Sequence, residues 1–142
     1  MDRNNLILAV LSAAGDGVLF SPVQVQKLFF LMDREIPGRV NGPHFNFRPY
    51  DYGPFDRSVY DSLDQLASQG LVNIGGHGSY RVYCLTPAGF QRGRESQATL
   101  EPAVLTYIRD VAAWVRGLSF EQLVAAIYNK YPEMKEKSIF RS

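Results

Sequence analysis

The sequence predicts a mainly α-helical α+β fold: a winged-helix-like domain with a small β-hairpin wing, an aromatic insert between its second and third helices, and two C-terminal helices. Two observations lead to this prediction. Apolar residues at helical spacing mark a helix over residues 56–69 that stops at Gly70, and two β-rich runs, 71–74 and 80–85, follow it. A glycine-rich turn at 75–78 joins the runs into a hairpin. A helix followed at once by a hairpin is the core of a winged helix.

Length and composition predict one domain over residues 1–142. With 142 residues, 46% of them hydrophobic, the chain can bury a core without a metal or a disulfide. The single cysteine, Cys84, cannot form an internal disulfide, which favours a reducing compartment. No apolar run approaches the roughly 20 residues that span a bilayer, and the first residues lack a signal-peptide pattern. We therefore expect a soluble, cytoplasmic protein with no membrane partner.

The first two helices and a short strand precede the insert. Apolar spacing predicts a helix over residues 2–14, and the short run 18–20 suits the small third strand that pairs with a wing. Ser21 and Pro22 are typical of a helix start, because serine caps an amide and proline at the first position loses no hydrogen bond. This second helix extends to about Glu35, and its broad apolar surface predicts that it is the central packing element.

Residues 36–54 form an insert that a minimal winged helix lacks. Its prolines and glycines exclude a continuous helix, and residues 45–47 alternate like a strand. Four aromatic residues between Phe45 and Tyr52 favour an ordered, packed insert over a disordered one. Whether the insert belongs to the core or to an interface stays open at this stage.

Within the insert, residues 52–54 are expected to form the turn that aims the third helix, with Gly53 allowing a close approach of the backbone. Strand-like alternation favours core positions for the phenylalanines, Phe45, Phe47 and Phe55. Arg48 and Asp51 are expected to pair and to fix the insert.

Three further segments follow the hairpin. Pro87 opens a helix, a stripe of apolar residues predicts another over 99–116, and Ser119 caps a last helix that ends near Pro132. The charged tail, 133–142, is expected to fray. The apolar stripe could pack on the first helix, or the C-terminal helices could form a homodimer through it.

Several of these segments together resemble the Panacea antitoxin domain family and the related YwgA-like proteins. The matching residues are the run 25–31, the aromatic segment Tyr52-Gly53-Pro54-Phe55, the helix positions Val59, Leu63, Leu66, Gly70 and Leu71, and the closing run 123–132. The resemblance covers most of the chain. It implies a winged-helix-like fold and, for Panacea members, neutralisation of a toxin by direct protein contact, in a toxin–antitoxin or defence context.

Charge bears on the alternative function, a winged-helix transcription regulator that binds DNA. The net charge is only +1, and the helix in the recognition position has Asp56, Asp61 and Asp64 against a single Arg57. A DNA interface would have to use the cations of this helix, the wing and the next helix: Arg57, His77, Arg81, Arg92 and Arg94. The charges favour protein contact over DNA.

Enzymatic chemistry has few candidate residues in this sequence. His44 lies near acidic residues, and Cys84 could be a nucleophile, but no histidine–cysteine spacing fits a metal site and no glycine-rich loop opens a helix after a strand. We therefore expect no enzymatic activity, no cofactor and no metal ion.

The favoured hypothesis is a protein-binding surface on the insert and on the helix after it. Tyrosine and arginine are enriched at interface hot spots, and such residues cluster here in the sequence. The predicted partner-binding residues are Arg48, Tyr50, Asp51, Tyr52 and Arg57, and the partner is a protein, for which a cognate toxin is one candidate.

Overall fold

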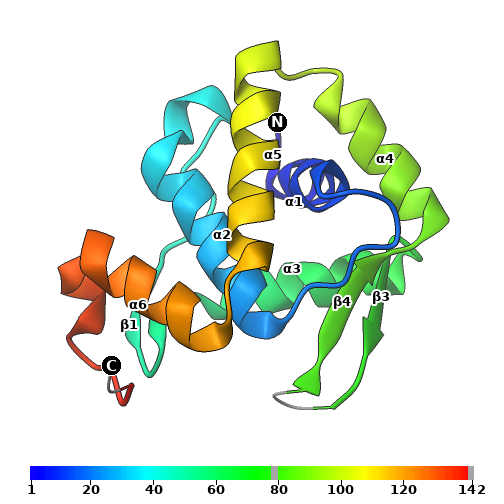
Figure 1. The fold of residues 1–142 in the computed structure, drawn as a ribbon. Coiled ribbons are helices and arrows are strands. Elements are labelled where there is room, and N and C mark those ends of the chain that lie inside the picture. The colour runs from blue at the N-terminus through cyan, green and yellow to red at the C-terminus, as the bar shows by residue number, and fades with distance from the viewer. Residues whose placement is uncertain (78–79, 141–142) are drawn as a thin grey trace.

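The structure, a computed structural model, describes residues 1–77 and 80–140 (Figure 1). The elements follow the chain as α1 (Arg3–Ala13), α2 (Pro22–Glu35), the 3-10 helix η1 (Pro37–Arg39), β1 (Arg48–Tyr50), β2 (Gly53–Phe55), α3 (Arg57–Ser68), β3 (Val72–Gly75), β4 (Val82–Leu85), α4 (Pro87–Gln97), α5 (Pro102–Gly117), α6 (Phe120–Lys130) and the 3-10 helix η3 (Pro132–Lys135). The predicted mainly helical α+β fold is confirmed. None of the described helices has the length and hydropathy needed to cross a membrane.

The wing is the antiparallel hairpin of β3 and β4, with Val72 opposite Leu85 and Gly75 opposite Val82. Residues 78 and 79, including the predicted turn residue Gly78, lie outside the described residues. The predicted third strand is reduced to a single bridge, in which Phe20 and Tyr83 exchange two backbone hydrogen bonds of 2.8 Å. This bridge ties the chain before α2 to the wing.

Helix α2 is the central packing element, as predicted. Every residue from 25 to 32 is buried, because other elements cover α2 on all sides. Figure 1 shows α5 running alongside α2, and α5 packs on both α1 and α2. Its apolar side consists of the buried residues Val104, Ile108, Ala112 and Val115. The stripe predicted over 99–116 therefore serves the core and is not free for a dimer, whereas a homodimer through the C-terminal helices stays a prediction.

The insert contains a second antiparallel hairpin, and its placement corrects the sequence prediction. No strand forms over 45–47. Strands β1 and β2 pair Arg48 with Phe55 and Tyr50 with Gly53, so that the turn falls at residues 51–52 and not at 52–54. Two prolines, which lack N–H groups, stand opposite each other between these pairs. A strand with proline at its centre is a poor candidate from sequence alone.

The insert's phenylalanines divide between two environments. Phe45 and Phe47 are partly buried against the core, where their rings lie 5.9 Å from Phe29 and 5.5 Å from Phe30 respectively. Phe55 is different, because its ring stacks at 5.0 Å on that of Tyr50, which is half exposed. The core position is thus found for the first two phenylalanines, and Phe55 lies nearer the surface.

The C-terminal segment is bound to the insert, which differs from the expected fraying. Met134 in η3 is buried, and the N–H of Ile139 donates to the carbonyl of Asp51 at 3.0 Å. The hydroxyl of Ser138 donates to the same carbonyl at 3.3 Å. Ser138 and Ile139 therefore bind the turn of the β1–β2 hairpin, whereas residues 141 and 142 lie outside the described residues.

A close helix contact gives the first testable prediction. A Cβ atom at Gly93 of α4 would lie 2.4 Å from the Leu8 carbonyl oxygen of α1 and 2.4 Å from the Ser12 hydroxyl oxygen. We expect Gly93→Ala to push α4 from α1 and to lower the free energy of unfolding by about 2 kcal/mol, measured by urea denaturation. Gly117→Ala, where a Cβ meets nothing within 4 Å, is the control and should cost nothing. Equal stability of the two variants would contradict the close packing.

Candidate functional site

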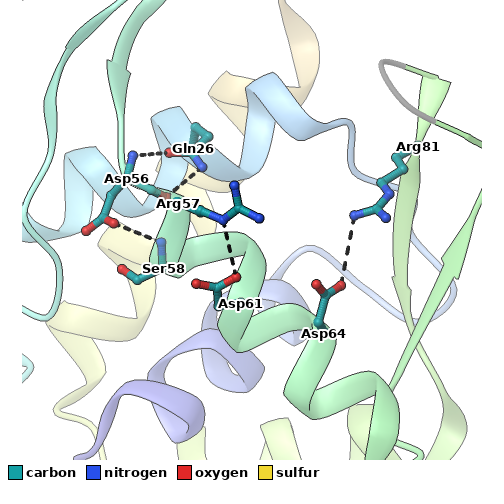
Figure 2. A network of polar contacts seen from close by, with 7 residues as sticks. All are labelled: Gln26, Asp56, Arg57, Ser58, Asp61, Asp64 and Arg81. Atoms are coloured by element: carbon teal, nitrogen blue, oxygen red, sulfur yellow. Dashed lines mark hydrogen bonds and ion pairs between the residues drawn. The ribbon is translucent and has the colours of Figure 1, made fainter.

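The end of the insert is held on α2 by the side-chain amide of Gln26 (Figure 2). The Asp56 N–H donates to Gln26 Oε1 at 2.9 Å, and Gln26 Nε2 donates to the Asp56 carbonyl at 2.9 Å. Only 2% of Gln26 is exposed. The side chain thus satisfies the backbone of Asp56 as a neighbouring strand would, which fixes the point where the insert enters α3.

The carboxylate of Asp56 joins two segments at this point. Its Oδ1 accepts from the Ser58 N–H at 2.8 Å and caps α3, and its Oδ2 accepts from the Asn46 N–H at 2.7 Å. Burial alone would raise the pKa of Asp56, but the hydrogen bonds from the Asn46 and Ser58 amides and the Ser58 side chain, together with the charge of Arg3, outweigh burial and hold the pKa below its ordinary value.

The middle of the insert is held by Asp33 at the other end of α2. Its two carboxylate oxygens accept from the N–H groups of His44 and Phe45, each at 2.8 Å. Arg3 donates to the His44 carbonyl and lies 4.5 Å from the centre of the Phe45 ring. The His44 ring nitrogen Nε2 lies 2.7 Å from the Val40 carbonyl, so this histidine holds the loop together.

Lys27, next to Gln26, is a charged residue whose side chain is buried. It is 3% exposed, and its ammonium donates one long hydrogen bond of 3.4 Å to the Pro54 carbonyl. Among the described residues, no carboxylate forms an ion pair with it. Burial disfavours the charged form and lowers the pKa of Lys27 to about 7.

Lys27 lines a hollow of about 600 Å³ between the two hairpins, at the N-terminal end of α2. We call this hollow the aromatic hollow because six aromatic residues line it: Tyr50, Tyr52, Phe55, Tyr60, Tyr83 and Phe120. The polar residues Gln26, Asp51 and Arg81 line it as well. Its volume falls in the range of pockets that bind small molecules or single side chains.

A second hollow of about 650 Å³ lies beside the aromatic hollow, and Tyr50 and Phe55 line both. Its charged lining residues are Arg48, Asp56, Arg57, Glu136 and Lys137. The β1–β2 hairpin therefore presents an aromatic face to one hollow and a mixed-charge face to the other.

The structure brings the predicted partner-binding residues together around these two hollows. Arg48 and Arg57 are exposed in the second hollow, whereas Asp51 and Tyr52 line the aromatic hollow and Tyr50 lines both. Tyr50 and Tyr52 are 52% and 42% exposed, so the tyrosines of the insert are available at the surface. The expected Arg48–Asp51 ion pair is wrong for the described residues, in which Asp51 fixes the hairpin turn through its backbone carbonyl.

The residues of the DNA-binding alternative do not form one cationic surface. Arg57 lies 3.9 Å from Asp61, and Arg81 lies 3.9 Å from Asp64 (Figure 2), so carboxylates of α3 accompany both cations. His77 is exposed in the wing loop.

Helix α4 carries the other two residues of that alternative, Arg92 and Arg94. Both are exposed there, apart from α3. Helix α3 thus presents negative charge where a recognition helix would need positive charge.

Sequence reasoning singled out neither Lys27 nor Gln26, nor the aromatic residues Tyr60 and Phe120 that complete the hollow. One signal was present, because Gln26 and Lys27 interrupt the apolar run of a helix that is buried on all sides.

Cys84 is half-buried, with its thiol donating to the Leu85 carbonyl at 3.4 Å. Among the described residues, no group of three or more His, Cys, Asp and Glu side chains could hold a metal ion.

The fold and the site define a winged-helix-like α+β domain that displays an aromatic hollow beside its second helix. Comparison with protein-family models, with curated proteins and with solved structures gave no match to the chain.

The Gln26–Asp56 contact gives a second prediction. Gln26→Leu keeps the size of the side chain but leaves the half-buried N–H and carbonyl of Asp56 without their partners, so we expect the free energy of unfolding to fall by about 2 kcal/mol. Gln91→Leu on the exposed side of α4 is the matched control and should change stability by less than about 0.5 kcal/mol. Chemical denaturation of both variants measures the difference. The role of Gln26 would be refuted by equal losses in the two variants.

Lys27 gives a third prediction, on pH. The folded chain releases the Lys27 proton near pH 7, whereas the unfolded chain holds it to about pH 10.5. The free energy of unfolding therefore gains up to about 1.4 kcal/mol per pH unit from Lys27 as the pH rises above 7. Lys27→Met should be the more stable protein at pH 6 and should lack this gain between pH 7 and pH 9.

The control for this measurement is Lys137→Met, which removes an exposed lysine and should keep the wild-type pH dependence. Denaturation at several pH values, compared between variants, isolates the Lys27 contribution from that of other groups. Parallel curves for wild type and Lys27→Met would contradict the depressed pKa.

Proposed function

We propose that the chain is a non-enzymatic protein-recognition module of the antitoxin type, which neutralises a partner protein by direct contact in a toxin–antitoxin or defence context. The observation that carries this proposal is the position of the exposed tyrosines Tyr50 and Tyr52. Both stand on a hairpin that borders two hollows and is held by α2 and the C-terminal segment. The resemblance to Panacea domains supports the antitoxin type.

Rigidity of the hairpin suits it to binding. Asp33 and Gln26 bind the chain on either side of the β1–β2 hairpin, and Ile139 binds its turn, so little conformational entropy is left to lose when a partner binds. Exposed tyrosine and arginine side chains beside an apolar hollow are the usual composition of an interface hot spot. Arg57 and Arg81 each lie 3.9 Å from a carboxylate of α3, and this pairing favours a protein partner over DNA.

The proposal predicts that the insert determines affinity for the partner. In co-expression with the product of the adjacent reading frame, we expect a stoichiometric complex and relief of any toxicity of that product. The double variant Arg48→Ala, Tyr50→Ala should weaken binding by about 2 kcal/mol or more, roughly thirtyfold, with an unchanged melting temperature. Titration calorimetry on the purified pair measures the loss.

The matched control is Arg92→Ala, which removes an exposed arginine of α4 and should leave affinity unchanged. A stable double variant that binds as tightly as wild type would refute the named site. Gel shifts with the DNA upstream of the gene test the alternative function. Tight binding that weakens steeply with salt would favour a DNA-binding regulator instead.

A further inference from the structure

The ammonium of Lys27 is a buried charge without a matching anion. A lysine has three N–H donors, and the one hydrogen bond from Lys27 to the Pro54 carbonyl is long at 3.4 Å. Burying a charge without a partner is strongly unfavourable. Leucine or methionine would fill the same space on α2 without that cost, so packing alone does not account for a lysine here.

The backbone of the insert is shaped around this side chain. Gly53 has φ +107°, and a Cβ atom there would lie 3.5 Å from both Cε and Nζ of Lys27 and 3.3 Å from the Tyr128 ring. Strand β2 thus covers the lysine stem closely, while Lys27 still lines the aromatic hollow. The charge is enclosed yet adjacent to a space that can hold a ligand.

We propose that the aromatic hollow binds a carboxylate carried beside an aromatic or apolar group, with the Lys27 ammonium as its ion-pair partner. Building on the function proposed above, this carboxylate belongs to a peptide segment of the protein partner. The six aromatic side chains that line the hollow suit an apolar group. The N-terminal end of α2 also borders the hollow, and a helix N-terminus favours negative charge.

The charges of the hollow favour a monoanion over a phosphate. Lys27 supplies one positive charge, and Arg81, which also lines the hollow, lies 3.9 Å from Asp64. The acidic residue Asp51 belongs to the same lining. A phosphate dianion would exceed the available positive charge, whereas a carboxylate matches Lys27.

Binding should therefore be linked to proton uptake. An anion next to Lys27 favours its charged form and raises its pKa from about 7. The other groups facing it are Asp51 and Arg81 of the lining, Tyr60 of α3 and Tyr128 of α6. Burial raises the pKa of both tyrosines, so they keep their protons up to pH 9.

The test uses N-acetylphenylalanine and its amide, N-acetylphenylalaninamide, as probes of the isolated chain. Calorimetry should show the acid binding about tenfold or more tightly than the neutral amide, the value of a charge-assisted hydrogen bond. At pH 8, titrations in two buffers of different ionisation enthalpy should show uptake of close to one proton per acid bound. Equal affinity for acid and amide would overturn the proposal.

Two variants assign the effect to Lys27. Lys27→Met should lose both the preference for the acid and the proton uptake, and its stability is expected to be at least that of wild type at pH 6, so loss of folding does not confuse the result. Arg92→Ala, which removes an exposed cation of α4 that lines neither hollow, should behave as wild type. Retention of the acid preference in Lys27→Met would overturn the assignment.

A competition experiment separates this inference from the function proposed above. Displacement of the bound protein partner by N-acetylphenylalanine, but not by the amide, would support a carboxylate of the partner in the hollow. Binding of the acid without displacement would assign the hollow to a free small acid and overturn the partner's role. The two proposals can also fail separately. If the Arg48→Ala, Tyr50→Ala variant loses partner binding but the wild-type protein binds neither probe, the carboxylate site is overturned and the protein-recognition function stands.

Discussion

The two hydrogen bonds between the Gln26 side chain and the Asp56 backbone are the constraint on which the site depends. An insert of about twenty residues, 36–54, would usually be held by a sheet or be mobile. Here two side chains of one buried helix bind the chain at residues 44–45 and at residue 56, Asp33 near the C-terminal end of the helix and Gln26 near its N-terminal end. The core helix of the fold therefore also determines the shape of the surface.

This arrangement places a buried charge and exposed aromatic side chains around the same hollow, beside one hairpin. Lys27 lies beneath strand β2, and Tyr50 stands at the surface in strand β1. A rigid hairpin keeps both in position before any partner arrives, and preorganisation of this kind raises affinity without adding contacts. The stability lost by burying Lys27 is in keeping with the general observation that functional sites are less than optimally stable.

Much of the fold was predictable from the sequence, because helical spacing and helix-start residues act locally. Ser21 and Pro22 begin α2 as expected, and the wing follows α3 as expected. The β1–β2 hairpin was not predictable, since its prolines contradict strand propensity and its bonds come from distant residues such as Ile139. For the site, the exposed tyrosines were identified, but the importance of Lys27 depends on its contacts with strand β2, which the apolar pattern of α2 does not encode.

The contact between the C-terminal segment and the hairpin turn has a consequence for sequence variation. The bond runs from the Ile139 N–H to the Asp51 carbonyl, and the Ile139 side chain itself is 59% exposed. Nearly every residue has the same backbone N–H and carbonyl groups, so substitutions at these two positions would leave the bond intact. Proline at position 139 is the exception, because it lacks the N–H. The bond depends instead on the number of residues between α6 and position 139. A one-residue deletion there would therefore disrupt the bond more than most substitutions would.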